Sequence, residues 1–107
     1  MAQEQTPALT VRDEWDGHGA TVTVRGEIDM TTVGVLRECL DQVVGRSPER
    51  LIIDLAAVSF LDTSAVHAFL DAKHALPRES SVVLRSPQRQ ARRVFELTGV
   101  DSVCVVE

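Results

Sequence analysis

The 107-residue sequence has few cysteines, no long apolar run and no excess of positive charge. Its two cysteines, Cys39 and Cys104, do not fit a disulfide framework or a metal-ligand cluster, and both fall in patterns typical of buried thiols. No stretch approaches the length that spans a bilayer, and the first residues lack the basic and apolar parts of a signal peptide. We therefore expect a cytoplasmic protein without direct membrane insertion.

The charge balance argues against a nucleic-acid partner. Eleven Lys and Arg residues stand against sixteen Asp and Glu residues, which gives a net charge of -5. Neutralising phosphates requires a clustered positive surface, so we expect no nucleic-acid binding. The acidic balance weakly favours a partner with a basic patch.

Signatures of catalysis are also missing. The sequence has no Gly-x-Ser-x-Gly elbow, no glycine-rich phosphate loop and no dinucleotide fingerprint. His67 follows Ser64 by three residues on the same expected helix, with no carboxylate implied that would orient it. A domain this short leaves little room for a pocket that excludes water. We therefore expect a binding protein without cofactors and not an enzyme.

The composition that is present fits one globular domain. Hydrophobic residues make up 44% of the chain and charged residues 25%, which is close to the globular average. Residues 1–7 are expected to form a flexible N-terminus and residues 8–107 the folded domain. No internal repeat, low-complexity tract or long linker divides the chain.

Apolar residues alternate in the first part of the chain and then recur at helical spacing. Residues 8–12 and 20–27 predict two antiparallel strands, and residues 13–19 between them suit a hairpin loop. From Val33 onward the pattern predicts a helix that Gly45 ends.

Strands and helices alternate in the second part. The pattern predicts, in order, a strand over 51–53, a connection over 58–63, a helix over about 64–76, a strand over 81–85, a helix after Pro87 that ends at Gly99, and a strand over 103–106. Such alternation implies parallel strands joined by right-handed crossovers. The expected fold is a single α/β domain, a mixed sheet of four to five strands packed with three or more helices, mainly on one face.

Asp62, Thr63 and Ser64 lie where the second helix should begin. This position follows the carboxyl end of a strand, the usual functional edge of an open α/β sheet. Free N–H groups in the first helical turn favour an anion, so a phosphoryl group on Ser64 would be tolerated there while adding nearly two negative charges. The simpler interpretation is that Thr63 or Ser64 caps the helix, as hydroxyl residues often do.

Four segments together resemble a known family. They follow one another in the family's order and spacing, and they are Gly26-Glu27-Ile28-Asp29, Leu51-Ile52-Ile53-Asp54-Leu55, Val58-Ser59-Phe60-Leu61-Asp62-Thr63-Ser64 and Val94-Phe95-Glu96-Leu97-Thr98-Gly99-Val100. They look like successive signatures of the STAS domain family. Its small stand-alone members are bacterial anti-sigma factor antagonists.

The resemblance implies a partner-switching function. An unphosphorylated antagonist binds an anti-sigma factor that is also a serine/threonine kinase, which frees a sigma factor. The kinase uses the ATP that it binds to phosphorylate the antagonist, and a PP2C-type phosphatase resets the switch. By this resemblance Ser64 is the acceptor, and the residues expected to bind the partner are Asp29, Asp62, Thr63, Ser64, Ala65 and His67.

Two positions depart from the family pattern. The family usually has glycine directly after the acceptor and a glycine or small residue two positions further on, whereas this sequence has Ala65 and His67. Ala65 adds one methyl group in the first helical turn. His67 is larger, is expected on the exposed side of the helix, and could alter which kinase fits.

Two other binding functions remain compatible with the sequence. The chain could be a STAS subunit of a larger, stressosome-like signalling assembly, or a subunit attached to a membrane ABC transporter, without a sigma-factor role. The residues do not separate these alternatives from a free antagonist.

Two further clusters have simpler explanations. His67, Asp71 and His74 share a helical face at a spacing that could bind zinc, but no fourth ligand is evident, and a solvated polar face is expected instead. Arg85, Arg89, Arg92 and Arg93 gather around the third helix. In an acidic chain they indicate a solvated surface or a protein contact.

Overall fold

The computed structural model describes residues 7–107, so only Pro7 of the expected flexible N-terminus lies within the described residues. The elements are β1 (Leu9–Asp16), β2 (Gly19–Ile28), α1 (Val33–Val44), β3 (Arg50–Leu61), α2 (Thr63–Ala75), β4 (Ser81–Arg85), α3 (Arg89–Thr98), the 3-10 helix η1 (Val100–Ser102) and β5 (Val105–Val106). The single α/β domain and mixed sheet predicted from the sequence are confirmed.

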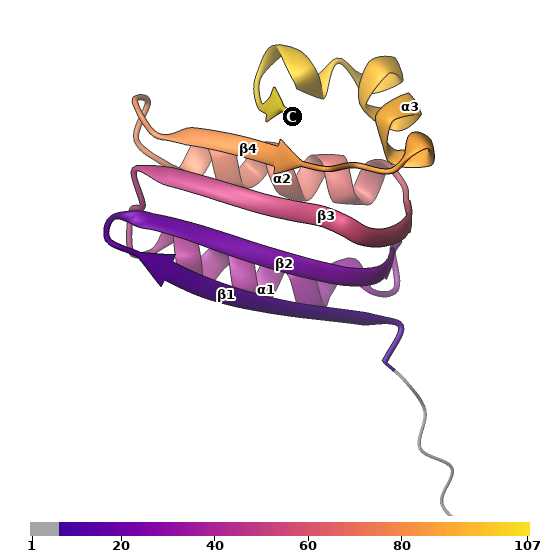
Figure 1. The fold of residues 1–107 in the computed structure, drawn as a ribbon, viewed down its shortest axis with the longest axis horizontal. Coiled ribbons are helices and arrows are strands. Elements are labelled where there is room, and N and C mark those ends of the chain that lie inside the picture. The colour runs from indigo at the N-terminus through magenta and orange to yellow at the C-terminus, as the bar shows by residue number, and fades with distance from the viewer. Residues whose placement is uncertain (1–6) are drawn as a thin grey trace, which may run out of the picture.

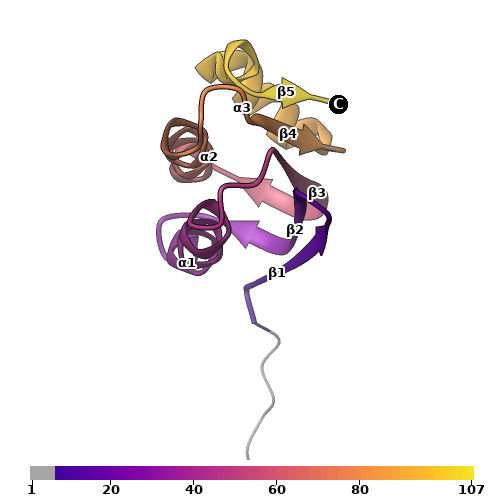
Figure 2. The same cartoon turned by 90° about the vertical axis from the view of Figure 1, so that its left-hand side faces the viewer.

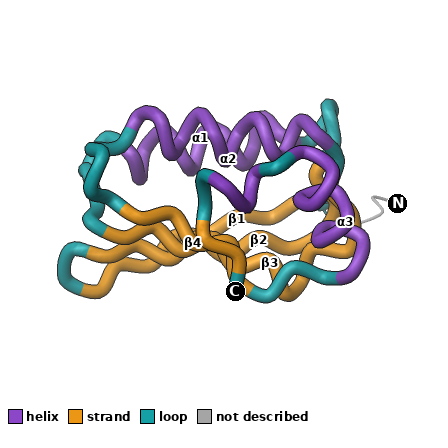
Figure 3. Tube along the Cα trace, turned by 90° about the horizontal axis from the view of Figure 1, so that it is seen from above, coloured by secondary structure: helices purple, strands orange, loops and turns teal. Residues whose placement is uncertain are grey.

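The strands lie in the sheet in the order in which they occur in the chain, β1-β2-β3-β4-β5 (Figure 1). β1 and β2 are antiparallel, and every later neighbouring pair is parallel. Helices α1 and α2 lie side by side on one face of the sheet (Figure 2). Seen from above, α3 lies near one end of the strands (Figure 3). Because each helix follows a parallel strand, all three begin at the edge where β2, β3 and β4 end.

The core forms between the sheet and α1 and α2. Alternation in β2 buries Val22 and Val24 completely and leaves Thr21 and Thr23 partly exposed on the other face. The helices contribute the matching apolar stripes, and Phe69 of α2 meets Phe95 of α3 edge to face, with ring centroids 6.3 Å apart. Burial of this apolar surface is the main stabilising contribution to the fold.

The predicted antiparallel hairpin is present, but its loop over residues 13–19 was predicted too long. β1 continues to Asp16 and β2 starts at Gly19, so the turn consists of Gly17 and His18, and Gly17 takes a left-handed φ of 61°. The polar residues Asp13 and Glu14 pair with Val22 and Thr21. They are tolerated in a strand because β1 is an edge strand with solvent beside it.

The expected connection over residues 58–63 was also wrong for its first part. β3 continues to Leu61, and two register shifts, each with an extra residue on β3, keep the long strands paired. Gly26 lies at the second shift with a φ of 114°, and a Cβ atom there would overlap the carbonyl oxygen of Ala8. Only glycine fits this position, because of its φ and the close approach of Ala8.

At the C-terminus, the predicted strand over 103–106 is confined to Val105–Val106, because the N–H groups of Val103 and Cys104 donate to the Val100 carbonyl oxygen in the turn that closes η1. Gly99 ends α3 in a left-handed conformation, as predicted. No helix within residues 7–107 is both long and apolar enough to cross a membrane.

Candidate functional site

The predicted acceptor segment lies at the edge of the sheet where all three helices begin. The backbone N–H of Asp62 donates a hydrogen bond to the carbonyl oxygen of Ile28, with N and O 3.1 Å apart. This bond joins the start of α2 to the end of β2. Asp29, the next residue in β2's exit loop, therefore lies in the loop beside the Asp62–Ser64 segment.

Asp62 is the cap of α2. Its Oδ1 accepts a hydrogen bond from the backbone N–H of Ser64, at 2.9 Å, and a second from the Ser64 hydroxyl. The simpler interpretation, in which Thr63 or Ser64 caps the helix, was therefore wrong. The Ser64 hydroxyl is held in one orientation by an acidic side chain, and Ser64 is partly exposed.

Asp29 shapes its own loop. Its Oδ1 accepts hydrogen bonds from the backbone N–H groups of Thr31 and Thr32, at 2.9 and 3.1 Å, and from the Thr31 hydroxyl at 2.7 Å. The hydrogen bond from the Thr31 side chain is the main reason that the pKa of Asp29 lies below its usual value. Asp29 is thus ionised and holds the loop before α1 in place.

The two residues that depart from the family pattern occupy different environments. His67 is exposed on α2, as predicted. Ala65 is completely buried, so its methyl group belongs to the core. Its side chain therefore has no surface with which to contact a partner directly, contrary to the expectation. Thr63 is exposed beside Ser64.

Gln90 is a positioning residue that the sequence interpretation missed. Its side chain accepts a hydrogen bond from the Leu61 N–H at 2.9 Å and donates one to the Leu61 carbonyl oxygen at 2.8 Å. It thereby ties α3 to the residue directly before Asp62. No local pattern marks this role, because the two residues are 29 positions apart.

Two exposed apolar side chains near this edge were missed as well. Met30, in the loop that contains Asp29, is 81% exposed, and Phe60, near the end of β3, is 39% exposed. Phe60 pairs with Glu27 in the sheet register, close to the residue whose carbonyl group binds Asp62. Large exposed apolar side chains would have been a usable signal only after the strand ends were known.

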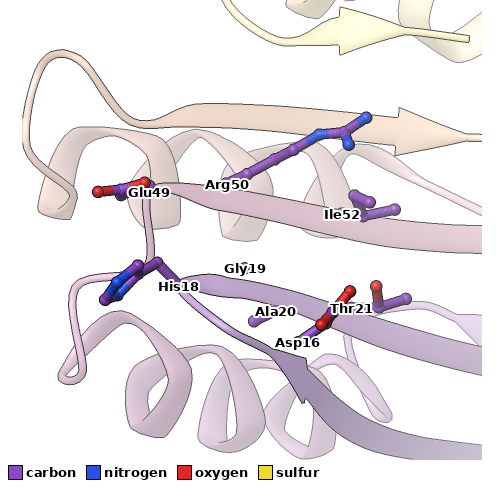
Figure 4. Close-up of a pocket in the computed structure, with 8 residues that line it drawn as sticks. All are labelled: Asp16, His18, Gly19, Ala20, Thr21, Glu49, Arg50 and Ile52. Atoms are coloured by element: carbon purple, nitrogen blue, oxygen red, sulfur yellow. The ribbon is translucent and has the colours of Figure 1, made fainter.

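A cavity of about 360 Å³ opens at the opposite end of the strands. Its lining includes Asp16, His18 and Glu49, with Arg50 and Ile52 on β3 (Figure 4). It lies at the amino ends of β2 and β3, whereas Ser64 follows the carboxyl end of β3. The cavity is therefore separate from the predicted acceptor site.

Of the three residues on α2 whose spacing could bind zinc, Asp71 makes a different interaction in the structure. Asp71 forms an ion pair with Arg37 of α1, with N and O 2.8 Å apart. No group of three or more His, Cys, Asp or Glu side chains within residues 7–107 is arranged to hold a metal ion.

The chain is a small α/β domain with a mixed five-stranded sheet, and all three helices begin at one edge of that sheet. A partly exposed serine lies at this edge, in the first turn of the helix that Asp62 caps. The STAS domain family model matches residues 9–106, and the chain belongs to this family. The resemblance found in the four sequence segments is confirmed.

Relatives with named functions are similar over most of the chain. The anti-sigma-F factor antagonist RsfB of Mycobacterium tuberculosis is 29% identical over 101 residues, covering 94% of this chain and 81% of the relative. An anti-sigma-B factor antagonist of Listeria monocytogenes is 30% identical over 95 residues, covering 88% of this chain and 83% of the relative. The structure of an anti-sigma factor antagonist from Mycobacterium paratuberculosis superposes with a TM-score of 0.86 at 32% identity, covering 92% of this chain and 84% of that chain.

More distant structures share the fold. The anti-sigma factor antagonist SpoIIAA in its unphosphorylated form superposes with a TM-score of 0.78 at 20% identity, covering 92% of this chain and 88% of that one.

Proposed function

We propose that this protein is an anti-sigma factor antagonist switched by phosphorylation of Ser64. In the unmodified state it binds an anti-sigma factor serine/threonine kinase in the cytoplasm and so frees a sigma factor. The observation that carries the proposal is the Ser64 hydroxyl, displayed at the start of α2 and held by Asp62. The names of the relatives support the choice of partner.

Phosphorylation would reverse the chemistry of the Asp62–Ser64 contact. The hydroxyl now donates a hydrogen bond to the carboxylate, whereas a phosphoryl group carries nearly two negative charges and only accepts hydrogen bonds. The donor is lost and like charges face each other. The phosphoserine side chain must then turn away from Asp62, towards the space that a partner would fill.

The surroundings of Ser64 suit a protein contact. Met30 and Phe60 expose apolar surface at the same edge, and Thr63 and His67 are exposed on α2. Apolar side chains buried by a partner would supply much of the binding energy. A dianion introduced into such a closed contact is costly when it is unpaired, which explains release.

A kinase assay tests the acceptor. The full chain is incubated with candidate anti-sigma factor kinases and ATP, and its intact mass is measured before and after addition of a PP2C-type phosphatase. We expect one phosphate, removed by the phosphatase, in the wild type and in Thr63→Ala, and none in Ser64→Ala. A phosphate on Ser64→Ala would overturn the assignment.

A binding assay tests the switch. Ser64→Glu should weaken kinase binding, whereas Ser64→Ala should bind and resist release by ATP. Gln42→Glu, an equal change of charge on the exposed surface of α1, is the matched control and should bind as the wild type does. Equal affinities of Ser64→Glu and the control would show that charge at Ser64 does not break the complex.

A further inference from the structure

Helix α3 carries a concentrated positive charge in an acidic protein. Arg89, Arg92 and Arg93 are all exposed and lie within the first half of the helix, while the whole chain has a net charge of -5. Together with Gln90 and Glu96 they line a hollow of about 690 Å³ on the surface. The switch proposed for Ser64 gives this hollow no role.

The guanidinium groups of this surface are available to a ligand. The ion pairs found within residues 7–107 involve Arg12, Arg37 and Arg85, and none of the α3 arginines. Arg92 donates through Nε to the carbonyl oxygen of Pro87, at 3.1 Å. Over the described part of the chain, Arg89 and Arg93 have no side-chain hydrogen bond at all.

The position of these arginines is unfavourable for the helix itself. The amino end of a helix carries a partial positive charge and is stabilised by acidic residues. The first turn of α3 contains no acidic residue, and its cap position, Gln88, makes no side-chain capping bond. A local arrangement that breaks the rules of helix stability is expected where function requires it.

An apolar side chain adjoins the arginines. Leu97 is 78% exposed and follows Arg93 by four residues, so the two side chains lie on one side of the helix. Planar guanidinium groups bind carboxylates through two parallel hydrogen bonds, and an exposed leucine adds an apolar contact. The apolar contact beside the guanidinium groups suits an acidic peptide with an apolar side chain better than the uniformly charged backbone of a nucleic acid.

We propose that the exposed face of α3 binds an acidic segment of a partner protein, with Arg89 and Arg93 pairing to its carboxylates and Leu97 contacting an apolar side chain. The proposal rests on the α3 side chains and not on the proposed switch at Ser64. The contribution of the arginines is electrostatic, so binding weakens as salt is added.

A titration of the isotope-labelled full chain tests the proposal. The probe is an acetylated and amidated peptide, Glu-Glu-Glu-Glu-Leu-Glu, and the control is the same peptide with glutamine in place of glutamate. We expect saturable shifts of the α3 amide signals with the acidic peptide at low salt and none with the control. Shifts absent from α3 would overturn the proposal.

Paired variants separate a specific surface from overall charge. Arg89→Glu/Arg93→Glu should lower the affinity for the acidic peptide by at least about tenfold. Arg12→Glu/Arg25→Glu changes the net charge equally at β1 and β2 and should lower it by less than about threefold. Thermal unfolding checks that both variants fold. Equal losses in the two variants, or tighter binding to duplex DNA or phosphatidylglycerol vesicles than to the peptide, would contradict the proposal.

Discussion

Helices α2 and α3 begin at the same edge of the sheet but in opposite ways. α2 is capped by Asp62, and its last turn carries Lys73 and His74, the basic residues that the helix dipole favours there. α3 lacks a side-chain cap and begins with arginines, which the dipole opposes. Its polar residues Gln88 and Gln90 bind instead to carbonyl and amide groups of β3.

The difference shows two ways of fixing a helix. The start of α2 is stabilised locally, and this local order gives the Ser64 hydroxyl a defined position. The start of α3 is held by contacts with distant residues, so its surface charges are free to serve another purpose. The following changes are ordered from the largest expected effect to the smallest.

Removing the contact between the two helices should have the largest effect. Phe95 is 2% exposed and packs edge to face on Phe69, so Phe95→Ala should lower the free energy of unfolding by about 3–5 kcal/mol. Urea unfolding followed by circular dichroism measures the change. Leu97→Ala, on the exposed side of the same helix, is the control and should change stability by less than about 0.5 kcal/mol.

Removing the link between α3 and β3 should have a smaller effect. Gln90→Ala deletes both hydrogen bonds to Leu61 and should cost about 1–3 kcal/mol, because a partly buried N–H and carbonyl group lose their partner. Faster amide hydrogen exchange at Leu61 should accompany the loss. Gln42→Ala on α1 is the control, and similar exchange at Leu61 in both variants would show that Gln90 does not hold this segment.

Removing the cap of α2 should cost about 1 kcal/mol. Asp62→Ala deletes the acceptor of the Ser64 N–H bond, whereas Asp62→Asn keeps an acceptor oxygen at the same place. In chemical unfolding, the wild type and Asp62→Asn should therefore have similar free energies of unfolding, and Asp62→Ala a lower one. An equal loss in both variants would assign the effect to the negative charge instead of the capping bond.

Correcting the charge at the start of α3 should have the smallest effect and the opposite sign. Arg89→Glu places an acidic side chain in the first turn and should raise the free energy of unfolding by about 0.3–1 kcal/mol at low salt. The gain should disappear in high salt. Arg25→Glu on β2 is the control without a helix dipole, and an equal gain there would attribute the effect to net charge.

Local signals predicted the helices well. Gly45, Pro77 and Gly99 mark where α1, α2 and α3 end to within two residues, because the freedom of glycine and the restriction of proline act locally. The strand over residues 81–85 was predicted with its correct bounds, since its apolar run is buried on both faces.

Long-range pairing explains what the sequence did not reveal. Ser59 and Phe60 are exposed, so their pattern resembled a connection, yet a register shift opposite Gly26 keeps β3 paired with β2 to Leu61. Ser64 was proposed as the acceptor from the family resemblance of its segment. The cap by Asp62 and the clamp by Gln90 depend on geometry that only the folded chain provides.

The strand order of the sheet has a consequence for how the domain is made. Each strand pairs with the strand synthesised just before it, so a chain growing from its N-terminus never has to insert a strand between two that are already joined. Only the antiparallel β1–β2 pair is local along the chain, whereas the parallel pairs join distant segments, and such pairing is slow to form. We therefore expect the β1–β2 hairpin to form early and the parallel strands to join it later.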